Sequence, residues 1–188
     1  MEAASSTTIT GEVVRTYSER DDGVPGSVTK EVLDFLGQRY SKSSPYEKRV
    51  LELGVGAGSI MTFLRDKFGD NKVIGMDIRD KLIRDEKIRK CLLAGEKMIL
   101  PVNQNSVEVI VSLHFFESSF DLENILCEVE RILIPGGEAT LVIPRTGKKG
   151  EPGVGLPGET KLGVDGFKEI SVPGEVGDAW IITLKKKK

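Results

Sequence analysis

The stretch from Arg49 to Phe68, RVLELGVGAGSIMTFLRDKF, constrains the fold of this 188-residue chain more than any other. It begins with an apolar run at residues 50–53, which has the length typical of a buried strand. Three glycines follow at alternate positions, Gly54, Gly56 and Gly58. Apolar residues then recur at helical spacing, which predicts a helix from about Ser59. A strand, a glycine turn and a helix in this order are typical of α/β folds that present backbone N–H groups and a helix N-terminus to a ligand.

The spacing of the glycines separates two classes of ligand. The dinucleotide fingerprint needs G-x-G-x-x-G, and its third glycine would fall here at Ser59 or Met61. The chain instead reads E-x-G-x-G-x-G from Glu52 through Gly58, and this spacing resembles the first motif of class I S-adenosylmethionine-dependent methyltransferases. The alternative is a turn that serves only tight packing of strand against helix, where glycine supplies unusual φ values and leaves out a side chain.

Two further segments resemble the same family. LPVNQNSVEVIVS, at residues 100–112, is similar to the LPFxDxSFDxVxS region of small-molecule methyltransferases, with alternating valines in a fourth strand. ILCEVERILIPGGEATLVIP, at residues 125–144, is similar to the helix, Pro-Gly-Gly turn and fifth strand of these enzymes. Three matches in the same order identify the chain as a member of the class I superfamily, of the small-molecule or "methyltransferase domain 11" type.

This resemblance implies a Rossmann-like α/β fold. The sheet is expected to be seven-stranded and mostly parallel, with an antiparallel last strand and helices on both faces. Beyond the first strand and helix, the pattern predicts helices at 27–40, 79–90 and 121–133, and strands at 72–77, 91–95, 107–111, 138–144, 167–172 and 178–185. Residues 145–165 are rich in glycine, proline and charge. The helix that normally follows the fifth strand is therefore expected to be reduced or missing.

The resemblance also implies S-adenosyl-L-methionine as cofactor and S-adenosyl-L-homocysteine as product. It assigns cofactor binding to Glu52, Gly54, Gly56, Gly58, Asp77, Ile78, Glu96 and Ser112. Glu96 is the acid nearest to the family's adenine-contacting position, which normally lies just before Leu100-Pro101. This chain has no acidic residue that aligns cleanly with the family's adenine-contacting aspartate.

Asp77 has a physical argument of its own. It ends the second strand roughly twenty residues beyond the glycine turn, where the ribose-binding carboxylate lies in folds that bind adenosine cofactors. An ionised carboxylate can accept from both ribose hydroxyls, and each charge-assisted bond contributes about 1.5–3 kcal/mol. The alternative is that Asp77 caps the next helix.

His114 is the only histidine and is the candidate catalytic residue. It follows the fourth strand, at the edge of the sheet that faces ligand in this fold. It could orient a substrate or act as a base near neutral pH, or it could be an ordinary packed or surface residue. Methyl transfer does not require a base, because the cofactor carries the reactive group and orientation can supply several kcal/mol, with about 7–11 kcal/mol as the limit. The chain has no Pro-Pro pair. This excludes the Asn/Asp-Pro-Pro-aromatic methyltransferases that act on adenine or glutamine amino groups, and no metal site is expected.

Composition sets the remaining expectations. The length, with 39% hydrophobic and 30% charged residues, predicts one domain at residues 11–184 between a disordered tail at 1–10 and a solvated lysine tail at 185–188. A net charge of −2 gives no reason to expect nucleic acid. No run is long enough for a membrane span, and the N-terminus lacks a signal-peptide pattern. Cys91 and Cys127 read as core or near-core thiols of a cytoplasmic protein.

Three functions are consistent with these features. The leading hypothesis is a methyltransferase that acts on an unidentified small molecule. The second is a catalytically degenerate binding or scaffold protein of the same fold, favoured by the unmatched adenine-side acid, the missing helix and the short chain. A nicotinamide-dependent enzyme comes third, because the glycine register and the Pro-Gly-Gly segment disfavour it. The sheet face without its helix could receive a protein partner, the glycine-rich loop could cover substrate, or the loop could be a plain flexible connection.

Overall fold

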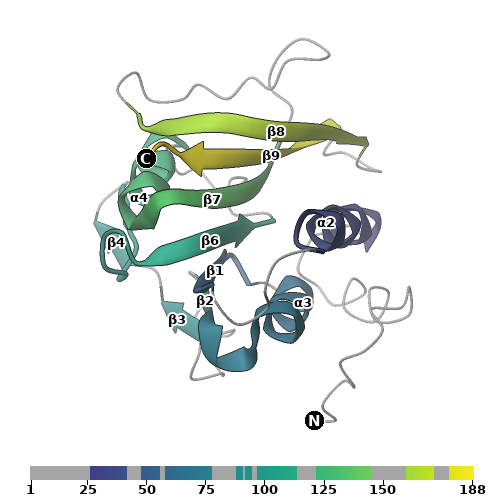
Figure 1. Cartoon of the computed structure of the whole chain (residues 1–188), viewed down its shortest axis with the longest axis horizontal. Helices are drawn as coiled ribbons and strands as arrows, with labels where there is room; N and C mark the ends of the chain where they lie inside the picture. Colours follow the sequence, from purple (N-terminus) through teal and green to yellow (C-terminus); the bar gives the residue numbers. More distant parts are fainter. Residues whose placement is uncertain are drawn as a thin grey trace.

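The computed structural model describes residues 26–41, 48–55, 58–77, 88–90, 92–94, 97–113, 122–144, 160–171 and 178–188. A seven-stranded sheet runs through the middle of these residues, in the order β3-β2-β1-β6-β7-β9-β8 (Figure 1). The elements in chain order are α2 (Gly26–Arg39), β1 (Val50–Leu53), α3 (Ser59–Phe68), the 3-10 helix η1 (Asp70–Lys72), β2 (Val73–Asp77), β3 (Ile88–Lys90), β4 (Leu92–Ala94), β5 (Lys97–Ile99), β6 (Val107–Ser112), α4 (Leu122–Ile132), β7 (Leu133–Pro144), β8 (Leu162–Ser171) and β9 (Asp178–Lys186).

One strand of the sheet is reversed. β1 pairs in parallel with β2 and β6, β2 with β3, and β6 with β7. β9 is antiparallel both to β7 and to β8, so β8 runs in the same direction as the other strands. The predicted seven-stranded, mostly parallel sheet with an antiparallel last strand is confirmed.

Helices cover both faces of the sheet, as predicted (Figure 1). On one face, apolar residues of α2 and α3 pack against the strands, among them Leu36 and Leu64. On the other face, α4 contributes Leu126 and Val129 to a second core. Successive residues of β1 alternate between these cores, because side chains of a strand point to opposite faces in turn: Val50 joins the α2–α3 core, and Leu51 joins the α4 core. Glu52 therefore lies on the α2–α3 face.

The third strand is not where the sequence placed it. Ile88–Lys90, predicted as the end of a helix, forms β3 at the edge of the sheet and pairs with β2. Leu92–Ala94, predicted as the third strand, pairs antiparallel with β5 in a separate two-stranded sheet. The helix prediction is wrong at residues 88–90, because a run of three residues is too short for its periodicity to distinguish helix from strand. Leu92–Ala94 is a strand, as predicted, but the prediction that it is the third strand of the main sheet is wrong. The rest of the predicted helix, residues 79–87, lies outside the described residues.

The Pro-Gly-Gly motif lies inside a strand instead of before it. α4 is confirmed, but β7 begins at Leu133 directly after it, and the β6–β7 register shifts between the pairs Val107–Leu133 and Val109–Glu138. Gly136 has a φ of 83°, in the left-handed region. A Cβ on Gly137 would approach the Ile134 and Glu108 carbonyl oxygens to 3.0 and 3.1 Å. Both glycines are therefore required, the first by its conformation and the second by lack of space.

The predicted lysine tail is wrong for Lys185 and Lys186, which belong to β9. Lys186 is buried, and its Nζ donates to the Glu130 carbonyl oxygen at 2.6 Å, the Leu133 carbonyl oxygen at 2.8 Å and the Asn105 Oδ1 at 2.8 Å. The ammonium thus pairs with carbonyls at the C-terminal end of α4, where the helix dipole favours a cation.

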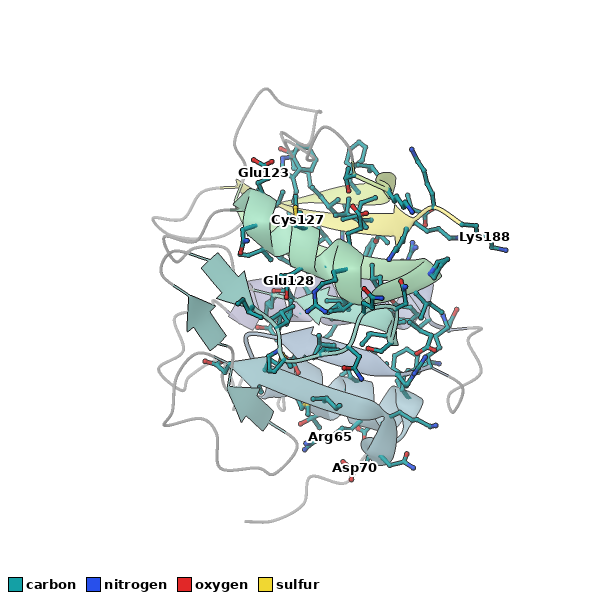
Figure 2. All side chains as sticks on the ribbon, turned by 90° about the vertical axis from the view of Figure 1, so that its left-hand side faces the viewer. Arg65, Asp70, Glu123, Cys127, Glu128 and Lys188 are labelled. Atoms are coloured by element: carbon teal, nitrogen blue, oxygen red, sulfur yellow. The ribbon has the colours of Figure 1, made fainter. Side chains whose placement is uncertain are left out.

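Three other predictions fall wholly or partly outside the described residues. Residues 1–10, predicted as a tail, are outside, as is Cys91. Of the segment 145–165, predicted as a loop with a reduced or missing helix, residues 145–159 are outside, and its end belongs to β8, which begins at Leu162 and not at Phe167. Cys127 is described and is exposed on α4, so its assignment to the core is wrong (Figure 2). The start of α2 at Gly26 places Ser27 inside the helix and not at its cap.

Candidate functional site

The candidate site lies at the carboxyl ends of β1 and β2, where the strand order reverses. The chain adds β2 and β3 on one side of β1 and then crosses to β6 on the other side. In open α/β sheets such a reversal leaves a crevice at the carboxyl edge, and ligands bind in it. The glycine turn follows β1 directly and so lies at this crevice.

Two of the three predicted glycines are described, and both have positive φ. Gly54 has a φ of 76°, and its N–H donates to the Met76 carbonyl oxygen at 2.7 Å, which ties the turn to the end of β2. Gly58 has a φ of 87° and precedes the first residue of α3. A Cβ at Gly58 would meet no atom within 4 Å, so the backbone beside it is open to a neighbouring group. Positive φ explains why glycine stands at both positions, and Gly56 lies outside the described residues.

Glu52 is a buried acidic residue of β1, two residues before Gly54. It is 1% exposed, and its strand neighbours in register are Gly75 on β2 and Val111 on β6. Its Oε2 has no hydrogen-bond partner among the described residues. Burial raises the pKa of Glu52 well above its usual range; the charge of Arg65 lowers it and that of Asp77 raises it. A buried, unpartnered polar atom is unusual in a folded protein and often marks a place where a ligand or water binds.

Asp77 occupies the same face of the sheet. It is the last residue of β2 and is 2% exposed. Val73 packs in the α2–α3 core, and by alternation Gly75 and Asp77 point to that face as well. Two carboxyl groups, from Glu52 and Asp77, therefore lie near each other on the α2–α3 face of the sheet.

Among the described residues, Arg65 contributes a positive charge near Glu52, and sequence reasoning missed it. It lies on α3, and its Nε is 3.2 Å from Asp70 Oδ1 (Figure 2). Its charge also acts on Glu52. The signal available in the sequence was its position six residues into the helix that follows the glycine turn, but the chain has 27 basic residues and nothing in the sequence distinguishes this one.

Ser112 joins the ends of two central strands. It is buried, and its hydroxyl donates to the Leu53 carbonyl oxygen at 3.1 Å. Leu53 and Ser112 are register partners whose side chains face the α4 core, opposite to Glu52 and Asp77. The structure thus brings together Glu52, Gly54, Gly58 and Asp77, while Ser112 supports their strands from the other face. Ile78, Glu96 and His114 lie outside the described residues, so their roles stay predictions.

A second group that the sequence reasoning missed fixes the Leu-Pro segment. Arg131 on α4 donates from Nη2 to the Leu100 carbonyl oxygen at 2.9 Å and from Nη1 to the Val102 carbonyl oxygen at 2.8 Å. Glu128, one turn earlier, pairs with Arg131 and accepts from the Leu100 N–H at 2.8 Å (Figure 2). The sequence signal for this pair was the spacing of an acidic and a basic residue three positions apart on one predicted helix. This pair holds residues 100–102 against α4.

Neither a metal site nor a membrane helix is found in the described ranges. No group of three or more His, Cys, Asp or Glu side chains there is placed to hold a metal ion. None of the helices in that part of the chain has the length and apolarity that crossing a membrane demands.

The strand order, the single reversed strand and the glycine turn at the crevice define a Rossmann-like protein with the topology of methyltransferases. The family described as methyltransferase domain matches residues 51–141, which include the glycine turn, β6, α4 and most of β7. This match supports, for residues 51–141, the class I S-adenosylmethionine-dependent methyltransferase superfamily that the motifs indicated.

Individual proteins agree with this assignment. Over 112 residues the chain is 29% identical to malonyl-[acyl-carrier protein] O-methyltransferase 1 of Coxiella burnetii, which covers 60% of this chain but only 39% of that relative. The N-methyltransferase NodS from Bradyrhizobium japonicum WM9 has a similar fold, with a TM-score of 0.60, 17% identity and coverage of 86% of this chain and 98% of NodS. NodS has also been solved in complex with S-adenosyl-L-homocysteine.

A third similar structure is a complex. The Haloferax volcanii methyltransferase activator Trm112 was solved with its methyltransferase partner, and the fold matches with a TM-score of 0.57 and 16% identity over 95% of this chain and 99% of that one. At these identities the structural similarities concern the fold alone.

Proposed function

We propose that this protein transfers the methyl group of S-adenosyl-L-methionine to a small-molecule acceptor and releases S-adenosyl-L-homocysteine. One observation supports this proposal above the others: the buried Glu52 carboxyl, whose Oε2 has no hydrogen-bond partner, lies two residues before Gly54 and on the same face as Asp77, at the carboxyl ends of β1 and β2 in a methyltransferase-type sheet. Because a buried carboxyl oxygen without a donor is unfavourable, this site is suited to a ligand that carries hydrogen-bond donors and positive charge.

The described residues fit the cofactor. Its amino-acid end carries an ammonium group that can donate to Glu52, and its approach requires backbone without side chains, as at Gly54 and Gly58. Its ribose hydroxyls can donate to Asp77. Gly56, Ile78 and Glu96 complete the proposed cofactor set, and Ser112 is proposed to contribute from β6.

When bound, S-adenosylmethionine supplies a methyl group already activated on a sulfonium. The chain's own residues then need only bind, orient and exclude water from the reactants, since alignment alone lowers the barrier substantially. His114 is proposed on the substrate side, where it would orient the acceptor or take its proton. The two relatives are named for methylation of oxygen and of nitrogen, so the acceptor atom does not carry over to this chain.

Cofactor binding tests the proposal directly. Isothermal titration with S-adenosylmethionine, S-adenosylhomocysteine and NAD should show binding of the first two only. Asp77→Ala should weaken binding at least about tenfold, or 1.4 kcal/mol, while Asp66→Ala, on the exposed side of α3, serves as the matched control and should leave it unchanged. Unchanged affinity in Asp77→Ala would remove this residue from the site.

The second candidate is a binding or scaffold protein of methyltransferase fold. Val164 and Phe167 on β8 are 47% and 49% exposed, and their register partners Leu184 and Ile182 place them on the α4 face. We propose that a protein partner covers this apolar part of the sheet, and the Haloferax complex shows that a protein with this fold can have one. A folded chain that binds neither methionine-derived ligand would favour this candidate over the enzyme.

The remaining parts of the proposal concern location and partners. The net charge of −2 supports a protein that does not bind nucleic acid. The two cysteines of the chain are too few for a disulfide framework and support a cytoplasmic location.

A further inference from the structure

Glu52 and Asp77 are close enough to influence each other's ionisation. Glu52 is in register with Gly75, and Asp77 lies two residues further along the neighbouring strand on the same face. Strand geometry then places their Cα atoms roughly 8 Å apart. Both residues are almost completely buried, at 1% and 2% exposure. Gly75 between them has no side chain, so nothing from β2 separates the two carboxyl groups.

In the part of the chain that the structure describes, the guanidinium of Arg65 on α3 favours ionisation of Glu52, and the charge of Asp77 opposes it. Arg65 also forms an ion pair with Asp70 of η1. The guanidinium is therefore shared between Glu52 and a further acid. Val111, the register partner of Glu52 on β6, is apolar and adds no charge. Two like charges in a buried site disfavour each other strongly, so one of them is expected to keep its proton.

Of the two acids, Glu52 is the one expected to keep its proton. Its Oε2 has no partner, whereas ionisation would require a donor for each oxygen. Burial raises the pKa of Glu52 well above its usual range, and the charge of Asp77 raises it further against the effect of Arg65.

We propose that Glu52 is protonated in the cofactor-free protein and releases its proton to solvent when the ammonium group of the cofactor's amino-acid end binds beside it. This inference rests on the proposed function, and it adds that cofactor affinity depends on pH. The arriving ammonium restores the charge balance, so the carboxyl group ionises and gains a donor. Affinity should therefore rise with pH, up to about tenfold per pH unit, until the cofactor-free protein itself has lost the Glu52 proton.

The experiment is isothermal titration of the protein with S-adenosylhomocysteine, which carries the ammonium group without the sulfonium. At about pH 6 an α-amino group is fully protonated, so it takes up no proton on binding. Titrations in buffers of different ionisation enthalpy then report the number of protons released. The expected number is about one for the wild type and near zero for Glu52→Gln, which retains shape and hydrogen bonding without a titratable proton. Asp66→Asn, a change in an exposed acid of α3 whose charge does not act on Glu52, should release the same number as the wild type.

The wild-type titrations alone can overturn the inference, whether or not the variant folds. Binding without proton release would refute it while leaving the proposed function intact, whereas absence of binding would refute both. Equal release from Glu52→Gln would show that the proton comes from another group. Infrared difference spectra give a second readout, since the carbonyl band of a protonated carboxylic acid should disappear when ligand binds the wild type. A band that persists refutes the inference as well.

Discussion

Replacing Lys186 with methionine removes an ammonium group while keeping a side chain of similar length in place. In the wild type this group donates three hydrogen bonds, to the Glu130 carbonyl near the end of α4, to the Leu133 carbonyl at the start of β7, and to Asn105 on the turn before β6. Asn105 has a φ of 50°, a left-handed conformation that asparagine tolerates better than most residues. Lys186 thus links β9, the end of α4 and this turn.

The expected loss of stability follows from the hydrogen-bond acceptors that Lys186→Met leaves without a donor. Each hydrogen bond from a charged donor contributes about 1.5–3 kcal/mol net, and an unsatisfied buried acceptor costs about 1–3 kcal/mol. The full sum is not reached, because burial of the ammonium group already costs free energy and because water can reach a site that is 8% exposed. Lys186→Met should therefore lower the free energy of unfolding by about 2–4 kcal/mol, which is a large effect for one side chain.

Urea denaturation followed by circular dichroism measures this difference. Lys188→Met, in the same lysine run but exposed and beyond β9, is the matched control and should change stability by less than about 0.5 kcal/mol. If Lys186→Met and Lys188→Met have the same midpoint and slope, Lys186 does not cap α4 and the reasoning fails.

Three further predictions concern the glycines and the pair on α4. Gly137→Ala should destabilise the protein by about 1–3 kcal/mol in the same urea assay, because its Cβ would meet two carbonyl oxygens, whereas Gly166→Ala, which meets no atom within 4 Å, should be close to neutral. Arg131→Met should lower stability by about 1–3 kcal/mol, since it removes donors from the Leu100 and Val102 carbonyls; loss of protection at residues 100–102 in hydrogen exchange would locate the effect. Burial alone would raise the pKa of Glu128, but the bonds from Arg131 and the Leu100 N–H outweigh it and lower the pKa. Glu128 therefore stabilises the fold above the ordinary pKa of a glutamate, its contribution is lost as pH falls through the lowered value, and stability should vary less over that acidic range in Arg131→Met than in the wild type.

Much of the fold could be read from the sequence because its central elements carry long, regular signals. The apolar run of β1, the glycine turn and the stripe of α4 each combine periodicity with a stop signal, and the structure places them as expected. β3 and β4 could not be placed, since strands of three residues are defined by their neighbours in the sheet and not by their own pattern.

The candidate site was predictable to a different degree. Glu52, Gly54, Gly58 and Asp77 were predicted from their positions along the chain, and they lie near the carboxyl ends of β1 and β2 and the beginning of α3. Arg65 could not be predicted from the sequence, because its role depends on the effect of its charge on the pKa of Glu52, which arises only when α3 packs on β1. Lys186 was misread for a similar reason: a run of four lysines reads as a solvated tail, and only the antiparallel pairing of β9 shows that one of them points into the protein.

The position of β9 between β7 and β8 has a consequence for how the chain reaches its native state. β9 comes after both neighbours in sequence, and its residue Lys185 pairs with Glu138 from far back in the chain. β7 and β8 therefore cannot pair with each other as they form. The space between them must stay unpaired until β9 inserts. Until then two strand edges are exposed to other molecules at once, which makes the late insertion of β9 the step where kinetic competition with aggregation is expected to be sharpest.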